Sequence, residues 1–136
     1  MAIHVVSIHD RHPGGDLAIE LRDVLDALGD EVAKHDWIAT RFEGGPLKPG
    51  TRVDGARLLS AAGGPGVVTD ATLFALPPGA DCATPTRSGF AGSPARLLVE
   101  VVEGAFLVVA AKDQKVVETL RSRFDDVRDE DAEASW

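Results

Sequence analysis

The sequence predicts a single α+β domain with a mainly antiparallel sheet of about five strands, two amphipathic helices and one short helix. Its 136 residues match the common size of one domain, and its 44% hydrophobic content suffices for a core. A β-hairpin is indicated in the second half, and strands and helices do not alternate strictly. The predicted order is β-α-β-α-β-β-β-α, with an optional last strand, and a small doubly wound α/β domain is the alternative.

The N-terminal part is predicted to form a strand and then the clearest amphipathic helix. Residues 2–9 are a short apolar run rich in β-branched side chains, which is typical of a strand. Asp16 is a candidate N-cap for the helix, and Gly29 is its natural stop. The apolar stripe of the helix recurs at helical spacing and comprises Leu17, Leu21, Val24, Leu25 and Leu28.

The middle of the chain carries weaker patterns and a long irregular stretch. Residues 37–42 indicate a second strand, and Asp54 precedes a short helix that ends at Gly63 and Gly64. Residues 67–76 indicate a third strand. Residues 77–94 are rich in Pro, Gly, Ser and Thr, and loops of this length are usually functional or mobile.

The C-terminal part contains the strongest β pattern. Two β-rich runs, residues 97–102 and 106–109, flank a two-residue turn at Glu103 and Gly104, which predicts a hairpin. Both of its faces are largely apolar, so we expect it to lie centrally, covered by helices on at least one side. Asp113 then caps a last helix with Val116, Val117, Leu120 and Phe124 on one stripe. The domain is predicted to span residues 1–128, Val127 can begin a closing strand, and residues 129–136 form an acidic tail.

Composition narrows the class of partner. The chain has 14 Lys and Arg against 22 Asp and Glu, and its formal net charge is −8. This charge disfavours nucleic acids and anionic membranes and favours a basic protein partner. Cys82 is the single cysteine, and the chain contains neither a basic leader nor about 20 consecutive apolar residues, so we expect a soluble cytoplasmic protein.

One loop is a candidate ligand site because it joins the end of a predicted strand to the start of a helix. Helix N-termini attract anions, and histidine with carboxylate side chains can bind a divalent metal. An anion site, a metal site and a solvated connector are the three interpretations. The candidate residues are His9, Asp10, Arg11, His12 and Asp16.

No pattern identifies a catalytic residue or a cofactor. Ser88 lacks the glycine-flanked elbow of a serine nucleophile, and Cys82 has no base nearby in sequence, so His35 would have to reach either one through folding. Gly63, Gly64 and Gly66 precede a predicted strand, which is the wrong context for a phosphate-binding loop.

The leading functional hypothesis is a non-enzymatic protein–protein interaction module, similar by analogy to inhibitor and immunity-type proteins of this size and charge. Trp37 is expected in the core, whereas Trp136 can anchor in a partner. The two alternatives are a small enzyme that uses the His9–Asp16 loop to bind a ligand or metal, and a structural homodimer that pairs through the hairpin edge. The partner-binding candidates are Asp125, Asp126, Asp129, Glu130, Asp131, Glu133 and Trp136.

Overall fold

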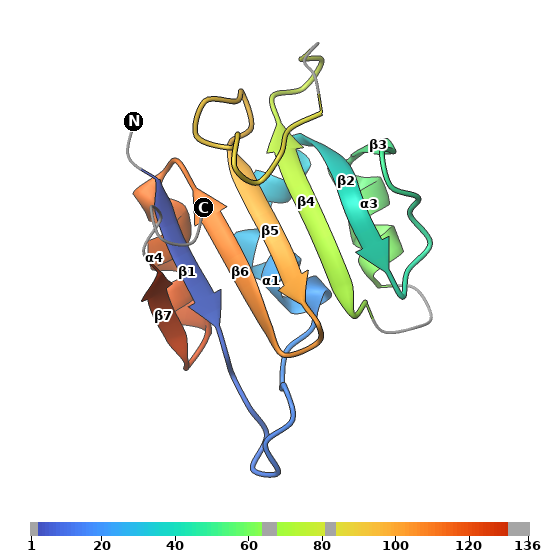
Figure 1. Ribbon diagram of the computed structural model, residues 1–136. Coiled ribbons are helices and arrows are strands. Elements are labelled where there is room, and N and C mark those ends of the chain that lie inside the picture. The colour runs from blue at the N-terminus through green and yellow to red at the C-terminus, as the bar shows by residue number, and fades with distance from the viewer. Residues whose placement is uncertain (1–2, 64–67, 81–83, 131–136) are drawn as a thin grey trace.

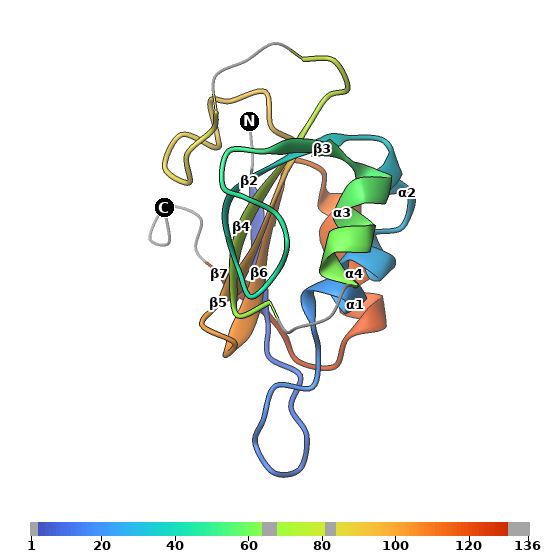
Figure 2. The same cartoon turned by 90° about the vertical axis from the view of Figure 1, so that its right-hand side faces the viewer.

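The computed structural model describes residues 3–63, 68–80 and 84–130, and these form one antiparallel sheet of seven strands with four helices. The strand order is β3-β2-β4-β5-β6-β1-β7, and every pair of neighbours is antiparallel. The helices all lie on the same face of the sheet (Figures 1 and 2). The predicted α+β class is therefore confirmed, and the doubly wound alternative is wrong because that fold needs parallel strands.

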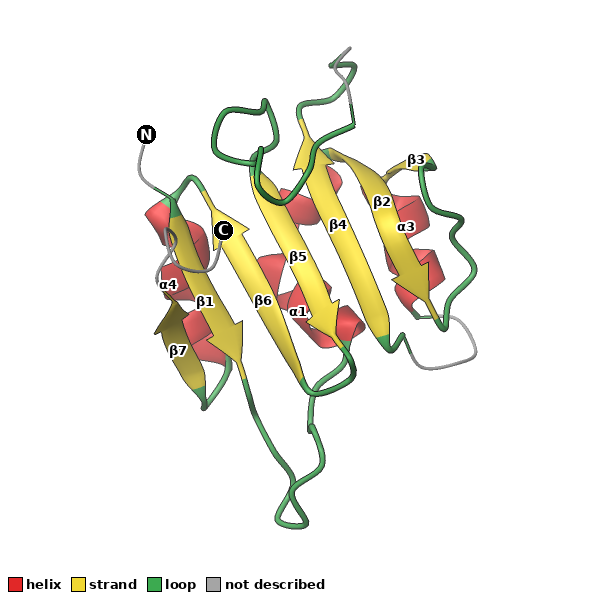
Figure 3. Cartoon of the chain, viewed as in Figure 1, coloured by secondary structure: helices red, strands yellow, loops and turns green. Residues whose placement is uncertain are grey.

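Strands and helices alternate irregularly along the chain (Figure 3). The strands are β1 (His4–Ile8), β2 (Asp36–Glu43), β3 (Arg52–Asp54), β4 (Asp70–Leu76), β5 (Leu97–Val102), β6 (Phe106–Ala111) and β7 (Val127–Glu130). The helices are α1 (Leu21–Leu28), α2 (Asp30–Ala33), α3 (Gly55–Ala62) and α4 (Gln114–Arg123). Among the described residues, no helix is both long and apolar enough to cross a lipid bilayer.

The predicted count of about five strands and three helices is corrected to seven strands and four helices among the described residues. The optional closing strand exists as β7, which pairs with β1 and includes Asp129 and Glu130 from the predicted tail. Strand β3 was not predicted because its three residues, with Val53 as the one apolar side chain, are too few to form a recognisable pattern. Helix α2 begins directly after Gly29, whose positive φ of 58° marks the end of α1 but not the end of helical structure.

The predicted N-cap of α1 is also corrected. Asp16 lies in a tight loop in which the His12 amide donates a hydrogen bond to the Asp16 carbonyl at 2.8 Å. Arg11 and Leu17 form an isolated antiparallel β-bridge at the base of this loop. Helix α1 instead begins after Glu20, whose backbone N–H donates to the Asp23 carboxylate at 2.7 Å. A capping interaction of this kind satisfies a donor that the first turn leaves unpaired.

The hairpin of β5 and β6 lies at the centre of the sheet, as predicted. Its turn uses positive φ at Glu103 (51°) and Gly104 (66°), the conformation that matches the twist of paired strands. Strand β5 also pairs with β4, and β6 with β1, so the hairpin presents no edge to a second copy of the chain. The homodimer hypothesis therefore loses its proposed contact, because the edge strands are β3 and β7.

Alternate residues of the central strands face the helices and form the main core. Leu97, Val99 and Val101 of β5 belong to this core, while Leu98 lies on the opposite face. Trp37 is fully buried in the main core, as predicted, and its indole Nε1 donates to the Val32 carbonyl of α2 at 3.0 Å.

The loop that follows β4 covers part of the helix-free face. Phe90 is buried there, and its ring lies 6.4 Å from that of Phe74 in β4. Arg87 of the loop forms an ion pair with Glu100 of β5, with Nε 3.1 Å from Oε1, and Thr72 Oγ1 lies 3.4 Å from Oε2. The described residues 84–94 of the irregular stretch thus cover part of the sheet.

Glu100→Gln is expected to stabilise the protein at neutral pH by about 1 kcal/mol, because burial disfavours the charged carboxylate. Glu100 is 9% exposed, and burial raises its pKa more than Arg87 and Thr72 lower it. Protonated Glu100 therefore contributes to the stability of the folded state, and this contribution is lost as the pH rises through the folded-state pKa of Glu100. Urea denaturation should show the gain at pH 7 and its disappearance at acidic pH, and a loss of stability at pH 7 would contradict the argument.

Candidate functional site

The side chains of the five residues of the predicted ligand loop do not converge on one another. Asp10 accepts hydrogen bonds from the backbone amides of Asp125 (3.0 Å) and Asp126 (2.7 Å). Arg11 donates to the Ala105 carbonyl, and His12 and Asp16 are exposed at the loop tip. Among residues 3–63, 68–80 and 84–130, no three His, Cys, Asp or Glu side chains are grouped to hold a metal ion.

His9, the fifth residue, belongs to a polar cluster on the helix-free face. Its Nε2 lies 2.7 Å from Ser7 Oγ, which donates to Glu130 Oε1 at 2.5 Å. The imidazole stacks on Phe106 with the ring centroids 5.0 Å apart, and burial is the main cause that lowers the pKa of His9. Ser7 is fully buried, so this cluster links β1 to β7 and does not offer a nucleophile to solvent.

The predicted acidic surface lies partly on β7 and is partly neutralised. The Asp126 carboxylate accepts from Arg128 Nε at 3.0 Å, and this hydrogen bond is the first cause of the lowered pKa of Asp126. Asp129 pairs with Arg121. Asp125 is exposed, whereas Asp131, Glu133 and Trp136 lie outside the described residues.

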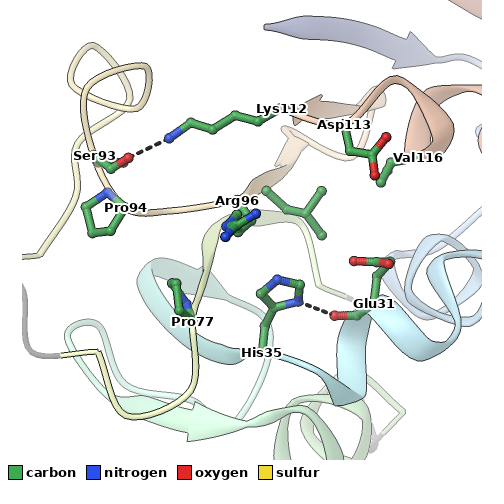
Figure 4. A pocket seen from close by; sticks show the side chains of 10 residues that line it. Glu31, His35, Pro77, Ser93, Pro94, Arg96, Lys112, Asp113 and Val116 are labelled. Atoms are coloured by element: carbon green, nitrogen blue, oxygen red, sulfur yellow. Dashed lines mark hydrogen bonds between the residues drawn. The ribbon is translucent and has the colours of Figure 1, made fainter. Parts of the chain in front are cut away.

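A cavity lies instead at the end of the sheet where β4 ends, β5 begins and β6 ends (Figure 4). Helices α2 and α4 form its other side. Its volume of about 480 Å³ falls within the usual range for small-molecule sites. The lining residues are Glu31, His35, Pro77, Ser93, Pro94, Arg96, Leu97, Lys112, Asp113 and Val116.

Two cationic residues are held side by side in this cavity by the register of the sheet. Arg96 directly precedes β5 and Lys112 directly follows β6, and Leu97 pairs with Ala111 in the adjacent register position. The Lys112 amide donates to the Arg96 carbonyl at 3.3 Å, and the Arg96 amide donates to the Ala75 carbonyl at 2.8 Å. Backbone pairing therefore fixes the two side chains as neighbours.

Arg96 and Lys112 have no ion-pair partner within the described part of the chain. Arg121 and Arg128, by contrast, pair with Asp129 and Asp126. Lys112 Nζ donates to the Ser93 carbonyl and lies 5.1 Å from the centre of the Phe90 ring. Burial and then the neighbouring Arg96 lower the pKa of Lys112. A bound anion would relieve this repulsion.

His35 adds a third polar group, and its tautomer follows from its hydrogen bond. Its Nδ1 lies 2.6 Å from the Glu31 carbonyl, which can only accept, so Nδ1 carries the proton. The neutral ring therefore leaves Nε2 as an acceptor, and the protonated ring makes it a donor. Figure 4 shows the imidazole between Glu31 and Arg96 in the cavity.

Sequence reasoning did not identify this cavity as a site. Its residues come from α2, the ends of three strands, the loop and α4. The sequence indicates only single residues of this cavity. Asp113 is predicted as a helix cap, and His35 is a base that could reach Ser88 or Cys82 only through folding. The sequence shows only that Arg96 directly precedes the first run of the predicted hairpin and that Lys112 lies three positions after the second.

Comparison with protein-family models, characterised proteins and solved structures found no match to this chain.

Proposed function

We propose that the protein binds the anionic group of a small molecule in the cavity between α2, α4 and the ends of β4, β5 and β6. The observation that supports this proposal is the adjacency of Arg96 and Lys112, two cations without ion-pair partners among the described residues. The anionic group would be a carboxylate or a phosphate. The proposal is one of binding and includes no catalytic step.

The chemistry of the two cations suits this role. A guanidinium presents parallel N–H donors that match a carboxylate or phosphate, while an ammonium adds a point charge. The aromatic ring of Phe90 and the Ser93 carbonyl hold Lys112 in place, so less side-chain freedom is lost when an anion binds. The apolar wall formed by Leu97 and Val116 can hold the remainder of a ligand.

Neutralising either cation is expected to weaken anion binding at least tenfold, which is about 1.4 kcal/mol. Arg96→Gln and Lys112→Gln would be compared with the original chain by NMR titration with inorganic phosphate, acetate and succinate. Arg57→Gln is the matched control, because Arg57 is exposed on α3, away from the cavity, and its loss changes the net charge equally. Equal affinities in all four proteins, or no binding at 10 mM of each anion, would contradict the proposal.

A second candidate function is binding of a basic protein through the carboxylates on and beside β7. The exposure of Asp125 and Asp129 at this edge of the sheet, together with the net charge of −8, supports it. Asp125→Lys should slow association with a basic partner and flatten its salt dependence, whereas Glu43→Lys on β2, near the opposite edge of the sheet, should not. Identical kinetics for the two variants would argue against this surface.

A further inference from the structure

We infer that the ligand of this cavity is dipolar, an aminocarboxylate whose acidic group meets Arg96 and Lys112 while its amino group meets Glu31 and Asp113. This inference rests on the proposed function and adds the class of ligand. It follows from the charges around the whole cavity, because Arg96 and Lys112 are two of four charged residues that line it.

The charges in the cavity are separated by sign. Lys112 reaches toward Ser93 of the loop, and Arg96 lies between Lys112 and His35, whereas the Glu31 and Asp113 carboxylates lie on the side formed by α2 and α4 (Figure 4). The two positive and two negative charges cancel. A purely anionic molecule would be attracted at one end and repelled at the other, and a dipolar molecule is complementary to both.

Both carboxylates retain capacity for an ammonium group. Asp113 accepts the Lys115 amide through Oδ1 at 3.0 Å as the N-cap of α4, and its other oxygen has no hydrogen-bond partner among the described residues. Glu31 lies 3.6 Å from Lys34 Nζ, an exposed pair one helical turn apart that contributes little binding energy. An ammonium donates three hydrogen bonds and can be shared between two such acceptors.

The wall between the charged ends is apolar. Leu97 is 2% and Val116 is 6% exposed, and both line the cavity together with Pro77. A short hydrocarbon segment that links the acidic and amino groups would contact this wall without leaving polar atoms unpaired. The predicted ligand is therefore a compact aminocarboxylate, and inorganic anions are expected to bind more weakly because they lack the hydrocarbon segment and the amino group.

The test compares probes that differ only in one charged group. NMR titrations would use butyrate, pentanoate and hexanoate against the corresponding 4-, 5- and 6-amino acids, with alkylamines of the same lengths and α-amino acids included. At least one aminocarboxylate is expected to bind tenfold or more tightly than its matched carboxylate. Glu31→Gln and Asp113→Asn should reduce this preference below threefold, and the asparagine preserves helix capping. Glu118→Gln, on α4 outside the cavity, is the control of equal charge change.

The outcomes separate this inference from the proposed function. Equal binding of carboxylates and aminocarboxylates, both lost in Arg96→Gln, would overturn the dipolar ligand and retain the anion site. A preference for aminocarboxylates that survives in both carboxylate variants would overturn the assigned position of the amino group. No binding of any probe at 10 mM would overturn the anion site and the dipolar ligand together.

Discussion

Trp37→Ala is expected to lower the free energy of unfolding by about 3–5 kcal/mol, the usual cost of removing a large aromatic side chain from a core. Trp37 has no exposed surface and packs between the sheet and the helices. Its indole also donates to the Val32 carbonyl, so truncation leaves that buried acceptor without this donor. Because most domains are stable by only about 5–15 kcal/mol, this single change should remove a large part of the total.

Urea denaturation followed by circular dichroism measures this effect without relying on tryptophan fluorescence. Trp37→Phe is the matched variant, because it keeps most of the aromatic volume and removes the Nε1 hydrogen bond. We expect its cost to be about half that of alanine or less. A loss below about 1 kcal/mol for Trp37→Ala would show that the side chain is not part of a closely packed core.

Elements with strong local patterns were predictable from the sequence. Helix α4 has an Asp113 cap and a regular apolar stripe, and the β5–β6 hairpin combines alternation with a Glu-Gly turn. In each of these the local preference agrees with the tertiary contacts. Strand β3 has three residues and depends on its pairing with β2. Helix α2 has four residues and depends on its contact with α3. No local sequence pattern reveals either contact.

The candidate site was not predictable for a related reason. Arg96 and Lys112 lie 16 positions apart and meet only because the register pairs Leu97 with Ala111. Glu31 comes from α2, the helix that the sequence did not indicate, and His35 lies just after it. The loop that contains His9 and Asp10 is dense in polar residues, but these two side chains have structural roles. His9 contacts Ser7, which bonds to Glu130 of β7, and Asp10 accepts hydrogen bonds from the backbone amides that lead into β7.

Gly55→Ala is expected to destabilise the protein by about 2–3 kcal/mol, although helix propensity alone predicts a gain of about 1 kcal/mol. Gly55 is the first residue of α3 and is buried against α2. A Cβ atom there would lie 2.2 Å from the Val32 carbonyl oxygen and 3.0 Å from Ala33 Cα. Both contacts are with backbone, so a side-chain rotation cannot relieve them and α2 must move.

The comparison with Gly14→Ala makes this prediction specific. Gly14 lies at the exposed loop tip, and an added Cβ meets nothing within 4 Å, so its replacement should change stability by less than about 0.5 kcal/mol. The displaced α2 carries Glu31, and His35 follows it, so Gly55→Ala should also weaken binding in the cavity. A stabilised Gly55→Ala protein would mean that α2 and α3 can separate at little cost, and the geometry of that side of the cavity would then not be fixed by this contact.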